Sequence, residues 1–190
     1  MTRLDVRKGW AAYKAAHDVE TNPRRRAILE VMMDHIKWEV LGQPDRILES
    51  VSPEAVYRFY GLSATTEMHG KDAIRGFYQG LADSGANVLQ LDIEHLAVGD
   101  WGLAAHGVWH QVYPGSALAG DGGLVHSDQV DDVHARYLVS QRMAWFFPFT
   151  NDDPPLLLGE LVYFEQTPFG VRKLAPGEEV FDEVTEASFS

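Results

Sequence analysis

Four long apolar segments fill the second half of the chain and limit the folds open to it. They span residues 88–98, 102–113, 134–149 and 156–165. Gly-Asp, Pro-Gly and Asn-Asp-Asp-Pro-Pro sequences separate them, which is typical of an antiparallel meander. Helical patterns occupy the first half of the chain. Helices followed by strands predict an α+β domain rather than a doubly wound sheet.

A long amphipathic helix is predicted over residues 24–41. Ile28 and His35 recur on its apolar stripe at helical spacing, and Asn22 and Pro23 supply a cap and a first-turn proline. This helix is expected to lie across the concave side of the sheet.

Shorter elements surround this helix. Helices are predicted over residues 5–19, 45–51 and 70–82, and a strand over residues 55–60. The connection 114–132 is long and glycine-rich, which is typical of a lid or a disordered loop. The acidic tail from residue 178 is expected to fray, apart from docking of Val180 and Phe181.

Composition limits the partners and the chemistry. The 190 residues carry a formal net charge of −12, so we expect neither a nucleic acid nor an anionic membrane as partner. The absence of cysteine excludes disulfides, thiolate nucleophiles and iron–sulfur clusters. Residues 1–10 lack the apolar core of a signal peptide, and no segment is apolar enough to span a bilayer. A cytoplasmic protein is therefore expected.

The last predicted strand carries one carboxylate in an apolar row. Its alternating face is formed by Leu156, Leu158, Glu160, Val162 and Phe164. Burial raises the pKa of a carboxyl until it can act as an acid or base near neutrality, or requires a partner that neutralises it. A structural hydrogen bond or an oligomer interface is the alternative role for Glu160.

Two histidines are candidates for the same interior. His35 lies on the inward stripe of its helix, where a lone histidine is more often a hydrogen-bonded core residue than a catalyst. His106 and His110 share one face of a predicted strand about 13 Å apart, which is too far to bind one ion. If His110 faces the pocket, it adds a second imidazole to His35 and Glu160.

A metal site is the alternative use of these groups. Glu160, His35 and His110 could form a two-histidine, one-carboxylate iron site. No motif of ligand spacing links them, so acid–base chemistry is favoured, and no metal or cofactor is predicted. A second cluster contains His126, Asp128, Asp131, Asp132 and His134. Its spacing differs from that of a calcium loop, which favours a solvated loop.

Large apolar side chains are expected to form the wall of a substrate pocket. The predicted lining residues are Tyr57, Trp38, Phe59, Val108, Trp145, Val162 and Phe164.

Three motifs resemble the SnoaL-like polyketide cyclases of the nuclear transport factor-2-like superfamily. They lie at residues 34–39, 107–110 and 159–165, and are similar to the family's Asn-His-x-x-x-Glu, Gly-Thr-His and Glu-Arg-Val-Tyr-Phe-Asp patterns. The resemblance covers residues 24–165. It implies an α+β cone, in which a curved antiparallel sheet wraps around a long helix and leaves a pocket at its open end.

The resemblance also implies the organisation and the partners of the chain. An N-terminal helical extension is expected at residues 1–22, the cone domain at residues 23–175 and an acidic tail at residues 176–190. The implied substrate is small and apolar, polyketide-like or terpenoid-like, and the chain is expected to form a homodimer. Val162, Phe59 and Val108 replace residues that relatives use in dehydration or epoxide opening, so epoxide hydrolysis is not implied.

The predicted function is an enzyme that moves a proton on a small apolar substrate without a cofactor, as in cyclisation, isomerisation or dehydration. Glu160 would be the general base or acid, with His110 as its partner. His35 would orient or protonate an oxygen, and Tyr57 would donate to a developing oxyanion. The competing class is a non-catalytic ligand-binding or dimerising module, because fold alone does not decide function.

Overall fold

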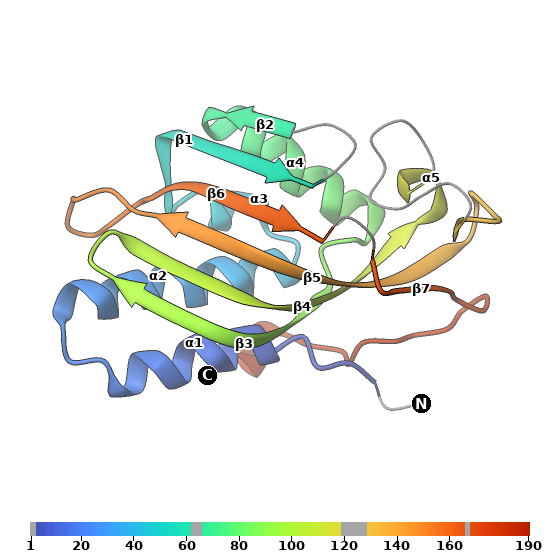
Figure 1. The fold of residues 1–190 in the computed structure, drawn as a ribbon, viewed down its shortest axis with the longest axis horizontal. Helices are drawn as coiled ribbons and strands as arrows, with labels where there is room; N and C mark the ends of the chain where they lie inside the picture. Colours follow the sequence, from blue (N-terminus) through green and yellow to red (C-terminus); the bar gives the residue numbers. More distant parts are fainter. Residues whose placement is uncertain (1–2, 62–65, 119–128, 166–167) are drawn as a thin grey trace.

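A computed structural model describes residues 3–61, 66–118, 129–165 and 168–190 (Figure 1). The helices are α1 (Lys8–Val19), α2 (Pro23–Val40), α3 (Pro44–Ile47), α4 (Gly70–Ser84), α5 (Gly115–Leu118) and the 3-10 helix η2 (Glu186–Ser188). The strands are β1 (Val51–Tyr60), β2 (Thr66–His69), β3 (Leu89–Gly99), β4 (Gly102–Pro114), β5 (Arg136–Pro148), β6 (Leu157–Phe164) and β7 (Gly170–Lys173). No helix in these ranges is long and apolar enough to cross a membrane.

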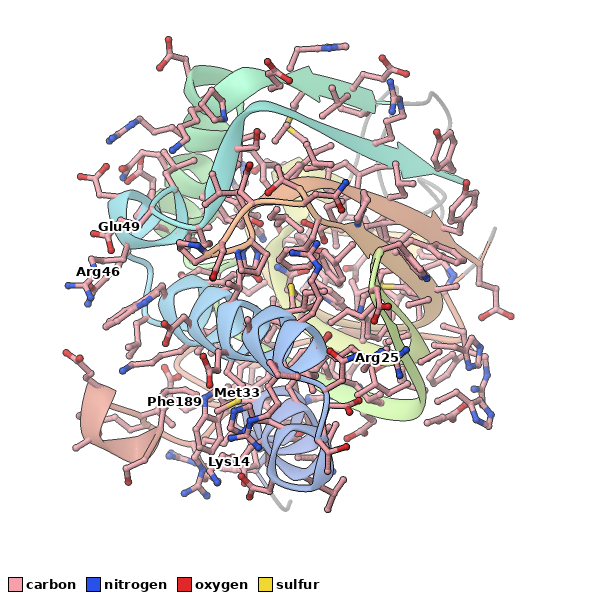
Figure 2. All side chains as sticks on the ribbon, turned by 90° about the vertical axis from the view of Figure 1, so that its left-hand side faces the viewer. Lys14, Arg25, Met33, Arg46, Glu49 and Phe189 are labelled. Atoms are coloured by element: carbon pink, nitrogen blue, oxygen red, sulfur yellow. The ribbon has the colours of Figure 1, made fainter. Side chains whose placement is uncertain are left out.

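The strands form one curved sheet in the order β2-β1-β6-β5-β4-β3, with β7 added beside β5. Strands β1 and β6 run parallel, and the other neighbouring pairs are antiparallel. Figure 2, viewed along α2, shows this helix on the concave side of the sheet. The predicted α+β cone is confirmed, and the β1–β6 pair is the exception to its antiparallel order.

Helix α2 has the predicted N-terminal cap and buries the predicted apolar stripe. The side chain of Asn22 accepts hydrogen bonds from the backbone N–H groups of Arg24 and Arg25, and Pro23 occupies the first turn. Ile28 and Met32 are fully buried against the sheet. This packing fixes the direction in which the C-terminal half of the helix presents its polar side chains.

A close approach of β1 and β6 sets the register beside the site. A Cβ atom on Gly159 would lie 2.3 Å from the backbone oxygen of Val56, so only glycine fits at this point. The parallel register then places Tyr57 opposite Glu160. Directly opposite residues point to the same face of a sheet, so both side chains enter the concave interior.

Several predicted boundaries differ from the structure. Strand β1 begins at Val51 because β6 pairs with it there, and this shortens the predicted helix 45–51 to four residues. Strand β2 was not predicted. Part of the predicted connection 114–132 forms α5, whereas residues 119–128 lie outside the described residues.

The predicted docking of Val180 and Phe181 is confirmed. Leu4 forms a parallel bridge with Phe181, and its N–H donates to the backbone oxygen of Val180 at 2.8 Å. The fraying predicted for the rest of the tail is wrong at its end. Phe189 is only 7% exposed and packs edge-on against Trp10. Apolar residues at the end of the tail therefore hold it against α1.

Candidate active site

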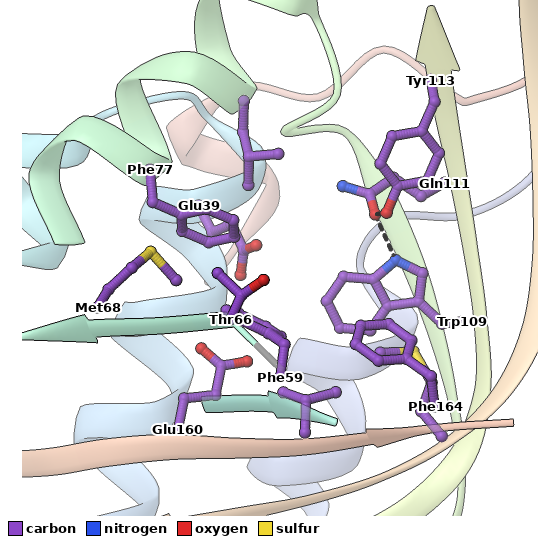
Figure 3. Close-up of a pocket in the computed structure, with 13 residues that line it drawn as sticks. Glu39, Phe59, Thr66, Met68, Phe77, Trp109, Gln111, Tyr113, Glu160 and Phe164 are labelled. Carbon is purple, nitrogen blue, oxygen red and sulfur yellow. Dashed lines mark hydrogen bonds between the residues drawn. The ribbon is translucent and has the colours of Figure 1, made fainter. Parts of the chain in front are cut away.

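A cavity of about 210 Å³ opens on the concave side of the sheet, beside the C-terminal end of α2. Strands β1, β2, β4, β5 and β6 and helix α4 supply the rest of its wall. The lining side chains are Glu39, Phe59, Thr66, Met68, Phe77, Leu81, Trp109, Gln111, Tyr113, Met143, Glu160, Val162 and Phe164 (Figure 3). Most of this wall is apolar and aromatic, which suits a small organic ligand.

Glu160 projects from β6 into this cavity and is only 7% exposed. Burial raises the pKa of its carboxyl to about 7, an effect that a hydrogen bond from Tyr78 partly offsets. A carboxyl with this pKa exists in both protonation states at neutral pH, so it can accept or donate a proton.

Glu39 is a second carboxyl on the same cavity. It projects from the last turn of α2, is also 7% exposed, and faces Glu160 across the cavity in Figure 3. Burial raises the pKa of Glu39 well above its usual range, and the charge of Glu160 raises it further. Two ionised carboxylates in one apolar cavity repel each other, which favours retention of a proton by the pair.

His35 reaches Glu160 through a tyrosine. The Nε2 atom of His35 lies 2.9 Å from the hydroxyl of Tyr78, whose single proton can be donated to Glu160 Oε2 or to the Tyr57 hydroxyl, each 3.4 Å away. Burial lowers the pKa of His35 to about 4, so its imidazole is neutral at pH 7. A neutral ring that donates from Nε2 would orient the Tyr78 hydroxyl toward the carboxylate.

The opposite wall carries polar atoms that bond to one another. The indole N–H of Trp109 donates to Gln111 Oε1 at 2.7 Å, and the Tyr113 hydroxyl donates to the same oxygen. The Gln111 amide nitrogen donates to the backbone oxygen of Ala86. This network fixes the Trp109 ring against the cavity.

The predicted lining residues divide into two groups. Phe59, Val162 and Phe164 line the cavity as predicted. Trp38 is buried elsewhere, where the cations of Lys37 and Arg46 lie 4.3 and 4.4 Å from the centre of its ring. The three correctly predicted lining residues all lie on the inward face of β1 or β6.

Trp145 and Tyr57 lie behind the cavity wall. Trp145 is buried in the core, where its indole N–H donates to the Tyr13 hydroxyl at 3.2 Å. Tyr57 is fully buried and contacts the site through Tyr78. Neither is among the described residues that line the cavity, which corrects the prediction for both.

The predicted position of His110 beside Glu160 is wrong. His110 lies on the outer face of β4, where its Nδ1 atom is 2.8 Å from the Ser140 hydroxyl and its Nε2 atom 3.3 Å from Asp92. Val108 is two residues away and therefore lies on the same outer face, so its predicted place in the pocket is wrong too. The strand alternation instead directs Trp109 inward.

The predicted alternative of an iron site is wrong, because His110 lies on the outer face of the sheet whereas Glu160 and His35 lie on the inner side. The three side chains cannot bind one ion. Within the described ranges, no group of three or more histidine and acidic side chains is placed to hold a metal ion. Asp131 and Asp132 pair with Lys173 at 3.1 and 3.3 Å. His126 and Asp128 of the predicted loop cluster lie outside the described residues.

Two residues of the site, Glu39 and Tyr78, were not among the predicted catalytic or lining residues, although Glu39 ends the motif at residues 34–39. Glu39 lies four positions after His35, which places both on one face of a helix, so the spacing could have identified it. Tyr78 lies on the apolar face of α4 with Phe77, and nothing in its spacing distinguishes a bridging hydroxyl from a core tyrosine.

Comparisons with known proteins give similarity in structure alone. No family model matches the sequence, and no curated protein sequence matches it significantly. A protein from Shewanella denitrificans designated a SnoaL-like polyketide cyclase superimposes with a TM-score of 0.55 and 16% identity, over 76% of this chain and 92% of that one.

Two further solved structures are similar. The epoxide hydrolase/cyclase-like enzyme SalBIII, from pyran ring formation in salinomycin, gives a TM-score of 0.51 at 13% identity, over 77% of this chain and 95% of its own. A protein from Novosphingobium aromaticivorans designated an aromatic ring hydroxylase gives 0.51 at 14% identity, over 81% and 96%. The chain therefore has a SnoaL-like, nuclear transport factor-2-like α+β cone fold.

Proposed function

We propose that this chain is an enzyme that moves a proton on a small, largely apolar substrate, with Glu160 as the acid–base group. The observation that carries the proposal is a buried carboxyl with a pKa of about 7 on the wall of an aromatic cavity. Perturbed carboxyls in clefts are frequent at catalytic sites. Cyclisation, isomerisation and dehydration each need a group that takes and returns a proton near neutral pH.

The supporting residues differ from those that the sequence suggested. Tyr78 takes the place proposed for His110, because its hydroxyl is the one that meets Glu160. His35 acts through Tyr78 as a positioning residue, since its ring does not line the cavity among the described residues. The Thr66 hydroxyl lines the cavity and takes over the role proposed for Tyr57, donation to a developing oxyanion.

The substrate class follows from the cavity wall. Aromatic and aliphatic side chains dominate it, which suits a polyketide-like or terpenoid-like carbon skeleton. The cyclase designations of proteins with the same fold are compatible with this class. A cytoplasmic homodimer remains a prediction.

Exchange of carbon-bound hydrogen tests the proposal. The protein is incubated in D₂O with 2-tetralone and other apolar ketones, and loss of the α-proton signal is followed by NMR. We expect exchange above the buffer rate, and Glu160→Gln should lower it by about 100-fold or more because the exchanging base is lost.

The matched control is Glu54→Gln, which changes an exposed carboxyl on β1 in the same way. Its exchange rate should equal that of the unmodified protein, and circular dichroism should show that both variants fold. Equal rates for the unmodified protein and Glu160→Gln would contradict the assignment of Glu160.

A further inference from the structure

The charges around the cavity are unbalanced. Glu39 and Glu160 are its only charged lining side chains among the described residues, and no lysine, arginine or histidine side chain joins them. The segments outside the described residues contain one histidine, His126, and no lysine or arginine. Buried carboxylates usually have a cationic partner or stay protonated. Among the described residues, this site has no such cationic partner.

The cavity wall also has more free hydrogen-bond acceptors than free donors. The Trp109 N–H and the Tyr113 hydroxyl already donate to Gln111, whose own amide donates to Ala86. The Thr66 hydroxyl and the second N–H of the Gln111 amide are the remaining neutral donors on the described wall. The two carboxyl groups supply four acceptor oxygens when ionised. The free polar atoms of the cavity therefore suit a ligand group that donates.

Glu39 is the group that most needs such a ligand. Its side chain is more than nine-tenths buried, is directed into the cavity, and forms no hydrogen bond or ion pair with any described residue. Glu160, by contrast, accepts a hydrogen bond from Tyr78. The Glu39 carboxyl thus opens onto the cavity without a protein donor among the described residues, and a cationic ligand would supply one.

Aromatic rings surround the two carboxyls. Phe59, Phe77, Trp109 and Phe164 present rings to the same space. Rings attract cations through their negative faces, most strongly where water is excluded. The net charge of −12 also attracts cations toward the protein.

We propose that the cavity binds an organic cation: a protonated amine on an apolar body, with the ammonium group between Glu39 and Glu160 and the body among the aromatic rings. This inference narrows the substrate class of the proposed enzyme and rests on the same cavity, but not on turnover. Glu39 ion-pairs with the ammonium group, which leaves Glu160 for proton transfer.

Binding then changes the protonation of the site. Burial and the charge of Glu160 raise the pKa of Glu39 in the free protein, so its carboxyl retains a proton to higher pH than an ordinary glutamate. An ammonium group beside Glu39 favours the ionised carboxylate. Amine binding therefore favours the release of a proton from the carboxyl pair.

Calorimetric titration with three probes of one shape tests the proposal. The probes are 3-phenylpropylamine, 3-phenylpropan-1-ol and 3-phenylpropionate, which share the body and differ in charge. We expect the amine to bind about tenfold more tightly than the alcohol, the value of one charge-assisted contact, and the propionate to bind least. If the amine releases a proton, its measured binding enthalpy should depend on the ionisation enthalpy of the buffer, whereas the binding enthalpies of the other two probes should not.

Variants locate the effect. Glu39→Gln keeps the shape and a neutral polar group, so it should remove the preference for the amine and leave the affinity for the alcohol within about twofold. Glu54→Gln should keep the preference. Equal affinity for amine and alcohol in the unmodified protein, absence of amine binding at millimolar concentration, or a preference retained in Glu39→Gln would each overturn the proposal.

The outcomes separate this inference from the proposed function. If the protein prefers the amine but does not exchange the ketone protons, it is a cation-binding module and the proposed enzymatic function is refuted. If it exchanges the protons of neutral ketones but does not prefer the amine, the proposed function stands and the proposed binding of an organic cation is refuted.

Discussion

In the part of the chain that the structure describes, ionisable side chains form ion pairs on the outer face of the sheet but not in the cavity on its inner side. On the outer face, His110 lies 3.3 Å from Asp92, and Arg142 lies 3.0 Å from Glu94. On the inner face, Glu39 and Glu160 share one cavity without a cation among the described residues. The outer pairs come from β3, β4 and β5, whereas Glu160 comes from β6 and Glu39 from the end of α2, which lies over the inner face.

This difference shows where the chemistry belongs. Partly exposed ion pairs are screened by water and contribute little to stability. Buried carboxyls without a cationic partner instead acquire raised pKa values, which is a property that acid–base catalysis and cation binding both use. The inner face is therefore the candidate site, although two predicted site residues lie on the outer one.

The largest effect should be a pH-dependent difference between the unmodified protein and Glu160→Gln. The folded-state pKa of Glu160 is raised from 4.5 to about 7, so its stabilising contribution is full below pH 4.5 and is lost as the pH rises through 7. Between pH 5 and 8 the unmodified protein should lose roughly 2 to 3 kcal/mol of unfolding free energy relative to Glu160→Gln. Urea denaturation at both pH values measures this loss.

The comparison with the variant cancels the contribution of His35. The pKa of His35 is lowered from 6.5 to about 4, so its contribution rises with pH over that range in both proteins. Glu54→Gln should show the pH dependence of the unmodified protein. Parallel pH profiles for Glu160→Gln and the unmodified protein would show that the inner carboxyl is no different from an exposed one.

Removal of the Tyr78 hydroxyl should have an intermediate effect. Tyr78→Phe deprives His35 Nε2 and Glu160 of their shared hydrogen-bond partner, which should lower the unfolding free energy by about 1 to 2 kcal/mol. The lost bond had lowered the pKa of Glu160, so the corresponding limb of the pH–rate profile should move to higher pH.

The control for this variant is Tyr60→Phe, because Tyr60 stacks on Tyr163 on the outer side of the sheet. It should leave the pH–rate profile in place. An unmoved profile for Tyr78→Phe would mean that the hydroxyl does not act on Glu160.

The smallest effect should come from the outer histidine. His110→Gln should change the unfolding free energy by no more than about 0.5 kcal/mol, because its partners are half-exposed polar groups. Ketone exchange should be unchanged. A large loss of exchange in this variant would return His110 to the active site and break the contrast between the faces.

The sequence predicts the fold better than the site. Long apolar runs with turn sequences predict the strands, and the capped stripe predicts α2, because both patterns are local. Glu160 and His35 were also found, since each interrupts an apolar row. These two are joined through Tyr78 in the structure.

The rest of the site depends on information that the sequence does not carry locally. An apolar strand such as β4 fits either orientation, so the choice between Trp109 and His110 as the inward residue rests on the register with β5. The opposition of Tyr57 and Glu160 arises from a parallel pair between strands far apart in the chain. Helical spacing could have indicated Glu39, but only its place beside Glu160 makes it unusual.

The most direct test is the titration of the glutamate carboxyls themselves. In protein labelled with ¹³C at glutamate Cδ, NMR from pH 4 to 9 should show one carboxyl titrating near pH 7, and Glu160→Gln should lack that signal. Titration of every glutamate in its ordinary range, with the cavity intact, would contradict the claim that this cavity holds an acid–base carboxyl.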